Sequence, residues 1–159
     1  MQLSFRRFGR DDFAEYAAWF VDPELDRWLG PMDEEWLEAV LSEGASEGTT
    51  WAVFREAMLV AVVETWSHPS NRSLAAITGL AVKPGLRRQG LGGAVLRETL
   101  AVNQRRGRFE HLAYIHGNNG TAQECFKRAG FVSSTMTPNG EGHLEFRHTA
   151  RRALEPARV

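Results

Sequence analysis

Residues 87–92 have the composition of an anion-binding loop. Gly90 and Gly92 stand two residues apart at the point where a helix is predicted to begin. Glycines let the backbone come close to a ligand, and the free N–H groups in the first turn of a helix attract an anion. Arg87 and Arg88 add positive charge and forked donors beside these groups. The loop therefore predicts a nucleotide-like cofactor held by its pyrophosphate, with a plain helix cap as the alternative.

The elements on both sides of this loop form a strand, loop and helix unit. Residues 74–82 are mostly apolar and are predicted to form the third strand of a meander with residues 49–55 and 58–66, which Pro84 and Gly85 stop. Residues 90–104 carry leucine and valine at helical spacing. The loop has neither the Gly-Lys-Ser/Thr of a Walker sequence nor the Gly-x-Gly-x-x-Gly of a dinucleotide fingerprint. The cofactor is therefore expected to belong to another class.

The rest of the chain predicts further strands and helices around this unit. Pro23, Gly30 and Pro31 are interpreted as breakers between two N-terminal helices, which begin near Arg10 and Asp33. Residues 112–116 are expected to pair parallel to residues 74–82. The other predicted strands are residues 3–8, 49–55, 58–66, 131–135 and 142–148, and the last predicted helix is residues 121–129.

Two motifs resemble those of the GNAT superfamily of N-acetyltransferases. Residues 80–92, LAVKPGLRRQGLG, are similar at every defined position to its acetyl-CoA motif, V-x-P-x-x-R-x-x-G-x-G. Residues 119–131, NGTAQECFKRAGF, resemble the second motif, N-x-x-A-x-x-x-Y-x-x-x-G-F, with Phe126 in place of the Tyr. The likeness extends over residues 3–148, although the N-terminal third is similar only in the order of its elements.

The resemblance implies an α/β fold with α+β layering. A GNAT fold has a central mixed, mostly antiparallel sheet of about six or seven strands with a splayed parallel pair, flanked by about four helices. Residues 1–149 are expected to form this single domain of the 159-residue chain. Residues 150–159 are expected to be a C-terminal tail, either frayed or packed on a partner subunit.

The resemblance also implies how acetyl-CoA is bound. The pantetheine arm would pair with the backbone of Leu80, Ala81 and Val82 like an added strand, and the Leu80 N–H would face the thioester carbonyl. Asn119 would contact the cofactor or the amine, although a helix N-cap is the alternative. The residues implied around the pyrophosphate are Arg87, Arg88, Gln89, Gly90, Leu91, Gly92 and Gly93.

The sequence departs from the family at both positions that usually handle protons. Phe126 stands where the family usually has a Tyr acid, and it is expected to pack near the cofactor sulfur instead. Ala76 falls near the place where many relatives carry a Glu base. The CoA thiol titrates near ~8.5, so its thiolate is a tolerable leaving group without an acid. The base must come from elsewhere or be water.

Three side chains are candidates for proton transfer. Tyr114 and His116 share one face of a predicted strand, and Tyr114 aligns with a position where some relatives carry a catalytic Glu. His116 is a candidate base, and Tyr114 is a candidate acid or relay. Glu64 would act on the amine through water. The alternatives are a half-buried aromatic, a histidine at a loop edge and a solvated strand residue.

The predicted reaction is acetyl transfer from acetyl-CoA to a primary amine of a small molecule or peptide, by direct attack on the thioester. Residues 1–50 contain twelve Asp and Glu but only four Arg, and the remainder carries the basic excess. These acidic helices favour polycationic acceptors such as aminosugars or polyamines. The lack of a clear catalytic base favours α-amines instead, because an α-amine is neutral more often than a lysine amine near pH 7.5 and needs less help to lose its proton. Both acceptor classes stay open.

Several other functions are weighed against this one. An acyl-CoA-binding sensor or scaffold without turnover would explain Phe126 and Ala76. A nucleic-acid binder would use short arginine clusters, but no recognised motif accompanies them. Transfer of a longer acyl group is a further alternative. The single Cys125 excludes an internal disulfide, and no metal site is expected. The chain is expected to be cytoplasmic, without membrane or nucleic-acid partners. Residues 142–148 are expected to offer a free strand edge, and a homodimer through this edge and a shielded edge are the two alternatives left open.

Overall fold

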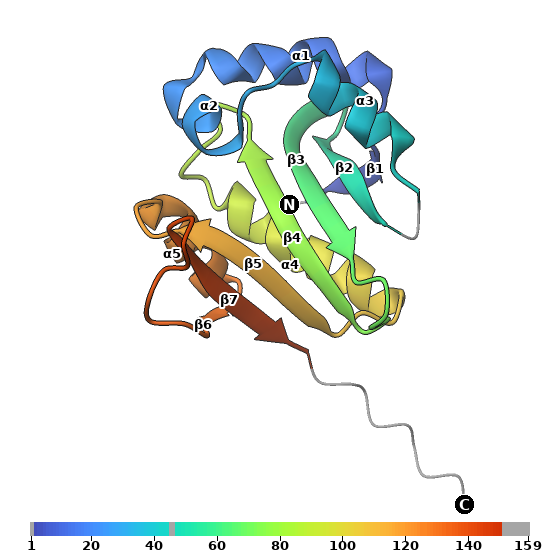
Figure 1. The fold of residues 1–159 in the computed structure, drawn as a ribbon. Helices are drawn as coiled ribbons and strands as arrows, with labels where there is room; N and C mark the ends of the chain where they lie inside the picture. Colours follow the sequence, from blue (N-terminus) through green and yellow to red (C-terminus); the bar gives the residue numbers. More distant parts are fainter. Residues whose placement is uncertain (1, 45–46, 151–159) are drawn as a thin grey trace, which may run out of the picture.

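A computed structural model describes residues 2–44 and 47–150 of the chain. Within them, a seven-stranded sheet has the order β1-β2-β3-β4-β5-β7-β6, and its β4–β5 pair is parallel while its other pairs are antiparallel (Figure 1). The strands are β1 (Ser4–Arg7), β2 (Gly48–Arg55), β3 (Met58–Ser67), β4 (Leu74–Val82), β5 (Glu110–His116), β6 (Val132–Ser133) and β7 (His143–Thr149). The mixed sheet with one parallel pair confirms the predicted fold class.

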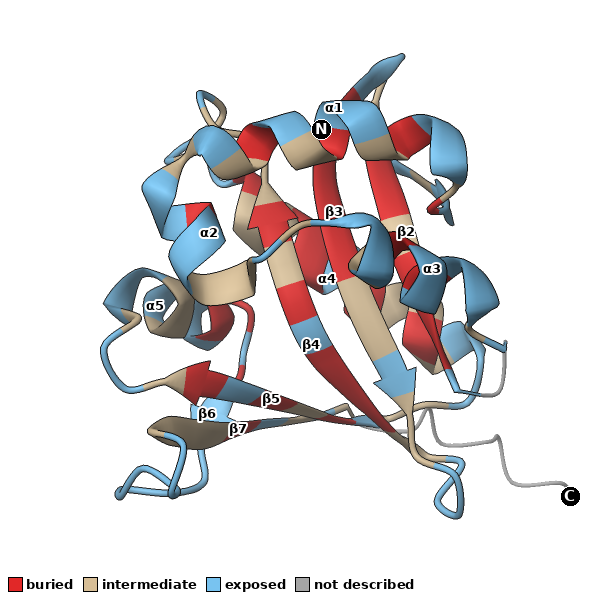
Figure 2. Ribbon diagram, turned by 45° about the horizontal axis from the view of Figure 1, so that its top comes forward, coloured by how far each residue is buried: buried red, intermediate tan, exposed pale blue. Residues whose placement is uncertain are grey.

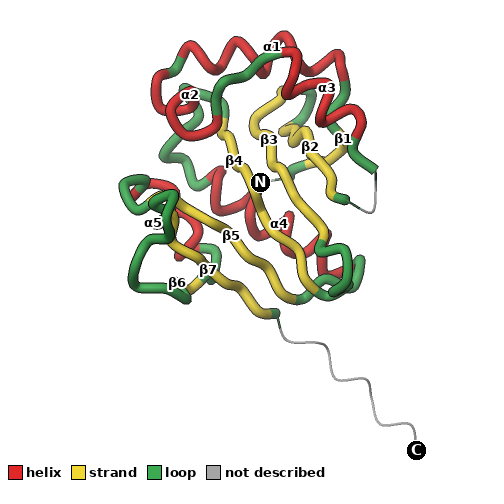
Figure 3. Tube along the Cα trace, viewed as in Figure 1, coloured by secondary structure: helices red, strands yellow, loops and turns green. Residues whose placement is uncertain are grey.

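Helices cover both faces of the sheet (Figures 1 and 3). The α-helices are α1 (Phe13–Ala18), α2 (Pro23–Leu29), α3 (Glu34–Ser42), α4 (Leu91–Arg105) and α5 (Gly120–Arg128), and short 3-10 turns flank α1. One core cluster joins the sheet to α4 and α5, with Val63, Leu96 and Phe146 buried in it. A second cluster, around Tyr16 and Leu37, joins the other face to the N-terminal helices. Figure 2 shows the buried residues on the strands between these layers.

Helix α2 corrects the sequence interpretation of Pro23. We expected Pro23 to break the chain, but it begins α2 as the first helical residue. Asp22 is the N-cap, and its Oδ1 accepts hydrogen bonds from the N–H groups of Glu24 and Leu25 at 3.1 Å each. Proline suits this position because its missing N–H would have no intrahelical partner and its fixed φ is helical. Gly30 is the C-cap that ends this helix, so its prediction as a breaker is confirmed.

The parallel strands β4 and β5 separate soon after they begin to pair. Their register covers only Leu74 to Ala76 opposite Glu110 to Leu112. From Ile77 onward β4 pairs with β3 alone, and β5 continues beside β7. The register of β3 and β4 also shifts, because Glu64 lies opposite Gly79 while Thr65 lies opposite Ile77. The shift leaves a bulge at Thr78. The separation of β4 from β5 leaves the edge of β4 beyond Ala76 without a strand partner on its β5 side among the described residues.

Two further predictions concern the ends of the molecule. Strand β6 pairs with Phe146 and Arg147, so the expected free edge of β7 is partly covered. Of the predicted tail, only Ala150 lies within the described residues. In the part of the chain that the structure describes, none of the helices is both long enough and apolar enough to cross a membrane.

Candidate active site

The loop that precedes α4 presents a row of free backbone donors. Gly90 is the N-cap of the helix in a left-handed conformation, with φ at 75°. Among residues 2–44 and 47–150, no group accepts a hydrogen bond from the backbone N–H of any residue from Arg88 through Gly93. A fifteen-residue helix adds the positive end of its dipole at the same place. The loop therefore has the donors that a pyrophosphate requires.

Gly90 and Gly92 serve different purposes in this loop. A Cβ on Gly90 would meet nothing within 4 Å, so this glycine is needed for its left-handed backbone and leaves the space in front of the loop open. A Cβ on Gly92 would lie 2.9 Å from Cys125 Sγ, so Gly92 allows α4 to pack closely on α5. The Cys125 thiol is part of that contact, and burial raises its pKa.

The two arginines of the loop differ in their surroundings. Arg87 forms a forked pair with Asp22, in which Nη2 lies 3.0 Å from Oδ1 and Nη1 lies 3.2 Å from Oδ2. Glu24 Oε2 is 3.8 Å from the same guanidinium. The Arg87 hydrogen bond lowers the pKa of Asp22. Arg88 is exposed, with φ at 63°. The sequence suggested that both arginines face the pyrophosphate, whereas the structure ties Arg87 to the start of α2.

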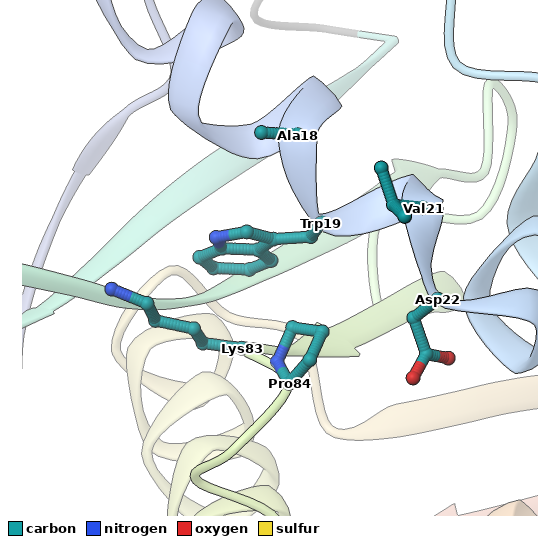
Figure 4. Close-up of a pocket in the computed structure, with 6 residues that line it drawn as sticks. All are labelled: Ala18, Trp19, Val21, Asp22, Lys83 and Pro84. Atoms are coloured by element: carbon teal, nitrogen blue, oxygen red, sulfur yellow. The ribbon is translucent and has the colours of Figure 1, made fainter.

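Asp22, the partner of Arg87, also lines an open cleft beside the loop (Figure 4). The cleft has a volume of about 350 Å³. Lys83, on its rim, lies 3.4 Å from Glu15. The lining residues are Ala18, Trp19, Val21, Asp22, Lys83 and Pro84. The cleft connects the end of β4 with the N-terminal helices, so the loop before α4 and helix α2 are neighbours in space.

Glu64 is the predicted proton acceptor that lies against β4. It projects from β3 toward α3, where its Oε1 accepts a hydrogen bond of 2.9 Å from Trp36 Nε1. Its other oxygen lies against Gly79, at the bulge in β4. Burial raises the pKa of Glu64, and the nearby charge of Glu43 adds to this, while the Trp36 donor opposes it. A carboxylate with a raised pKa is better suited to accept a proton near neutral pH.

Tyr114 and His116 lie on the same face of β5, as predicted, but make separate contacts. The Tyr114 side chain is 53% exposed, and its hydroxyl donates to Glu145 Oε2 at 3.1 Å. Burial and the Glu145 carboxylate raise the pKa of Tyr114. His116 Nδ1 accepts from the Asn118 N–H at 3.0 Å. Among the described residues, no hydrogen bond or ring contact links either side chain to Glu64.

The sequence does not point to Glu145, and it does not predict that Trp28 lies beside His116. Glu145 lies opposite Tyr114 in the β5–β7 register, and Arg147 Nε and Ser134 Oγ each donate to it at 2.8 Å. These donors lower its pKa. The Trp28 ring, on the unexpected helix α2, lies 5.1 Å from the His116 ring. Only the strand register and the presence of α2 reveal these neighbours.

The remaining predicted residues have structural contacts. Phe126 is buried and packs on Phe131 with ring centroids 5.0 Å apart. Asn119 caps α5, because its Oδ1 accepts from the Ala122 N–H at 3.2 Å. Ala76 is buried at the last paired position of β4. No three or more His, Cys, Asp or Glu side chains within residues 2–44 and 47–150 are grouped so that they could hold a metal ion.

Free amides at a helix start, next to a splayed parallel pair, are the arrangement that the two motifs led us to expect of an acyl-CoA-dependent transferase. Residues 10–131 match the acetyltransferase (GNAT) family. Because this match covers more than half of the chain, the protein belongs to that family, whose members use acetyl-CoA as acetyl donor. The family predicted from the two motifs is therefore confirmed. A comparison with curated protein sequences gives no match.

Solved structures of acetyltransferases share the fold. An aminoglycoside acetyltransferase in complex with coenzyme A and kanamycin superposes with a TM-score of 0.77, at 14% identity, over 93% of this chain and 95% of that one. The ribosomal-protein-S18-alanine N-acetyltransferase from Escherichia coli gives a TM-score of 0.69, at 18% identity, over 99% and 100%. At these identities the likeness concerns the fold alone.

Proposed function

We propose that this protein transfers the acetyl group of acetyl-CoA to a primary amine by direct attack on the thioester. The observation that supports this most is the row of free N–H groups from Arg88 through Gly93 beside the unpaired edge of β4. Acetyl-CoA, when bound, supplies an activated acyl group. The amides of the loop bind its pyrophosphate, and Leu80, Ala81 and Val82 offer backbone groups to the pantetheine arm.

Glu64 is the proposed proton acceptor. As the amine nitrogen forms its bond to the thioester carbon, the carbon–sulfur bond breaks and its electron pair leaves on the sulfur. Glu64 takes the excess proton of the nitrogen, directly or through water, and the Leu80 N–H stabilises the negative charge on the carbonyl oxygen. The thiolate leaves without an acid because the CoA thiol titrates near ~8.5. No other residue therefore has to supply the acid that Phe126 lacks.

Tyr114 and His116 are proposed to line the acceptor side of this site. Trp28, Glu145 and these two side chains combine aromatic surface with one carboxylate. Such a wall suits a cationic amine. The amine belongs to a small molecule or peptide, and the fold neighbours named for aminoglycosides and for a ribosomal protein illustrate both classes. A cytoplasmic location and a homodimer stay predictions, the second testable by size-exclusion chromatography.

The test is colorimetric release of the CoA thiol from acetyl-CoA in the presence of different amines. A panel of peptide α-amines, lysine peptides, polyamines, aminoglycosides and free amino acids covers the acceptor classes. Turnover above the hydrolysis background with one class supports the proposal. If acetyl-CoA raises the melting temperature but no amine is acetylated, the binding-only alternative gains support instead.

A further inference from the structure

We infer that Gly79 and Trp36 are positioning residues that hold the Glu64 carboxylate against the cofactor edge of β4. This inference rests on the proposed function, in which Glu64 accepts the proton. Gly79 provides the space for one carboxylate oxygen, and Trp36 fixes the other. Neither residue carries a group that needs to touch the reacting atoms.

The space above Gly79 is filled by Glu64. The two residues lie opposite each other across β3 and β4, next to the bulge at Thr78. A Cβ built on Gly79 would overlap with Glu64 Oε2. The backbone of Gly79 is not left-handed, so its φ does not require glycine. Close approach of the carboxylate is therefore the physical reason for glycine at this position.

Trp36 is held in one orientation by other aromatic rings. Its ring lies 5.3 Å from Phe8 and 5.3 Å from Tyr16, and it stacks on Phe13 at 6.4 Å, measured between centroids. Helix α3 supplies the residue, and Asp33 caps the start of that helix by accepting from the Trp36 N–H at 2.9 Å. The indole donor is thus directed at Glu64 before any substrate arrives.

The two carboxylate oxygens of Glu64 have different surroundings. Oε1 is committed to Trp36. Within the described residues, Oε2 accepts no hydrogen bond, and it lies over Gly79, one residue before Leu80. Because β4 has no β5 partner at this point, the free oxygen borders the proposed path of the pantetheine arm. Proton transfer needs such an uncommitted lone pair.

Two other titratable groups face Glu64. Tyr16 of α1 stays neutral because burial raises its pKa. Glu43, at the end of α3, has a pKa that burial also raises, and its charge adds to the shift of Glu64. The Trp36 donor favours the ionised form of Glu64. Loss of this donor should therefore move the Glu64 titration to higher pH.

The experiment is a ¹³C NMR titration of the glutamate carboxyl groups in the free protein, with Glu64→Gln identifying the Glu64 signal. Trp36→Phe should raise its midpoint by about one pH unit. Trp51→Phe is the matched control and should leave the midpoint unchanged. The Trp51 ring lies on β2 and contacts Phe5 and Arg106. An unchanged midpoint in Trp36→Phe would overturn the inference.

Activity provides the second readout. Gly79→Ala should lower kcat about a hundredfold with an unchanged KM for acetyl-CoA, whereas Gly140→Ala, whose Cβ would meet nothing within 4 Å, should not. Shortening the acid in the Gly79→Ala, Glu64→Asp double variant should restore part of kcat by removing the overlap. Full kcat in Gly79→Ala would contradict the inference. If the wild type acetylates no amine, the proposed function fails, and the titration still decides whether Trp36 positions Glu64.

Discussion

The proposed cofactor loop and the proposed proton-transfer wall, which consists of Trp36, Glu64 and Gly79, are built on different principles. The loop from Arg88 through Gly93 uses six consecutive backbone N–H groups. The wall depends on the side chains of Trp36 on α3 and Glu64 on β3, and on the space that Gly79 of β4 leaves for the Glu64 carboxylate. A backbone site needs only a permitted conformation at each residue, so many side chains are tolerated in it. A side-chain site needs the correct register of every element that contributes to it.

This difference separates binding from chemistry. Changes in the loop should weaken acetyl-CoA binding with little effect on the proton acceptor. Changes in the wall should lower kcat and leave the affinity for acetyl-CoA unchanged. The predictions for Glu64, Gly90, Asn119 and Asp22 test this separation, and the prediction for His111 concerns stability alone.

Glu64→Gln should have the largest effect on turnover. The amide cannot accept the proton, so kcat should fall by about 10²-fold or more. The dissociation constant of acetyl-CoA should stay within about twofold, because no loop donor changes. Glu98→Gln, an exposed acid on α4, is the control and should keep full activity. Steady-state kinetics with calorimetric binding checks both values, and a parallel loss of affinity would break the separation.

Buried His111 should set an acid limit on stability that is independent of Glu64. Burial, with His148 and Arg108 nearby, lowers the pKa of His111 to about 4, from 6.5. Its contribution to stability is therefore complete above pH 6.5 and is lost as the pH falls toward 4, by up to roughly 3 kcal/mol. Urea unfolding at pH 7 and pH 4.5 measures this loss. His111→Gln should flatten the dependence, and an unchanged slope would contradict the prediction.

Gly90→Val should weaken acetyl-CoA binding about thirtyfold, or ~2 kcal/mol, without a specific effect on proton transfer. A β-branched residue is strained at the left-handed φ of 75° and would disturb the neighbouring amides. Gly107→Val is the matched control, because Gly107 has φ at 84° and equally open space around it. The two variants should lose similar stability in thermal unfolding. Equal acetyl-CoA affinities in both would show that Gly90 does not serve the cofactor.

Asn119→Ala should destabilise the protein by about 1 kcal/mol through loss of the α5 cap. Asn119→Asp keeps the capping oxygen and should retain the stability. Thermal unfolding with binding measurements separates this role from cofactor contact. A loss of acetyl-CoA affinity in Asn119→Asp at full stability would place this residue in the cofactor site.

Asp22→Asn should have the smallest effect, about a threefold gain in acetyl-CoA affinity at low salt. The change removes the charge that pairs with Arg87 and keeps the cap of α2, because asparagine also caps helices. Glu24→Gln is the control, since its oxygen lies farther from Arg87, at 3.8 Å. Calorimetry at two salt concentrations checks the gain. Weaker binding would show that Asp22 orients Arg87 for the cofactor.

The sequence predicts the fold and the loop well because their signals are local. Strand β4 begins and ends at the predicted residues, and the loop motif is contiguous. Helix α2 was missed because Pro23 was interpreted as a breaker, whereas a preceding Asp22 makes it a helix start. Whether a proline begins or breaks a helix depends on the residue that caps the helix start, here Asp22.

The proton-transfer wall is less accessible to sequence analysis. The sequence places Glu64 on a strand as a candidate, but its contact with Trp36 spans 28 positions in the chain. The bulge at Thr78 decides that Gly79, and not a neighbour, lies opposite Glu64. Glu145 was missed because it reaches Tyr114 only through the pairing of β5 with β7. Register and bulges are tertiary features that local patterns do not specify.

The most direct test of the account is an NMR titration of the ¹⁵N-labelled protein with coenzyme A. The largest amide shifts should fall on Arg88 through Gly93 and on Leu80 to Val82, while the Trp36 indole signal should move little. Amide shifts concentrated elsewhere, with residues 88–93 unaffected, would contradict the assignment of the loop as the cofactor site.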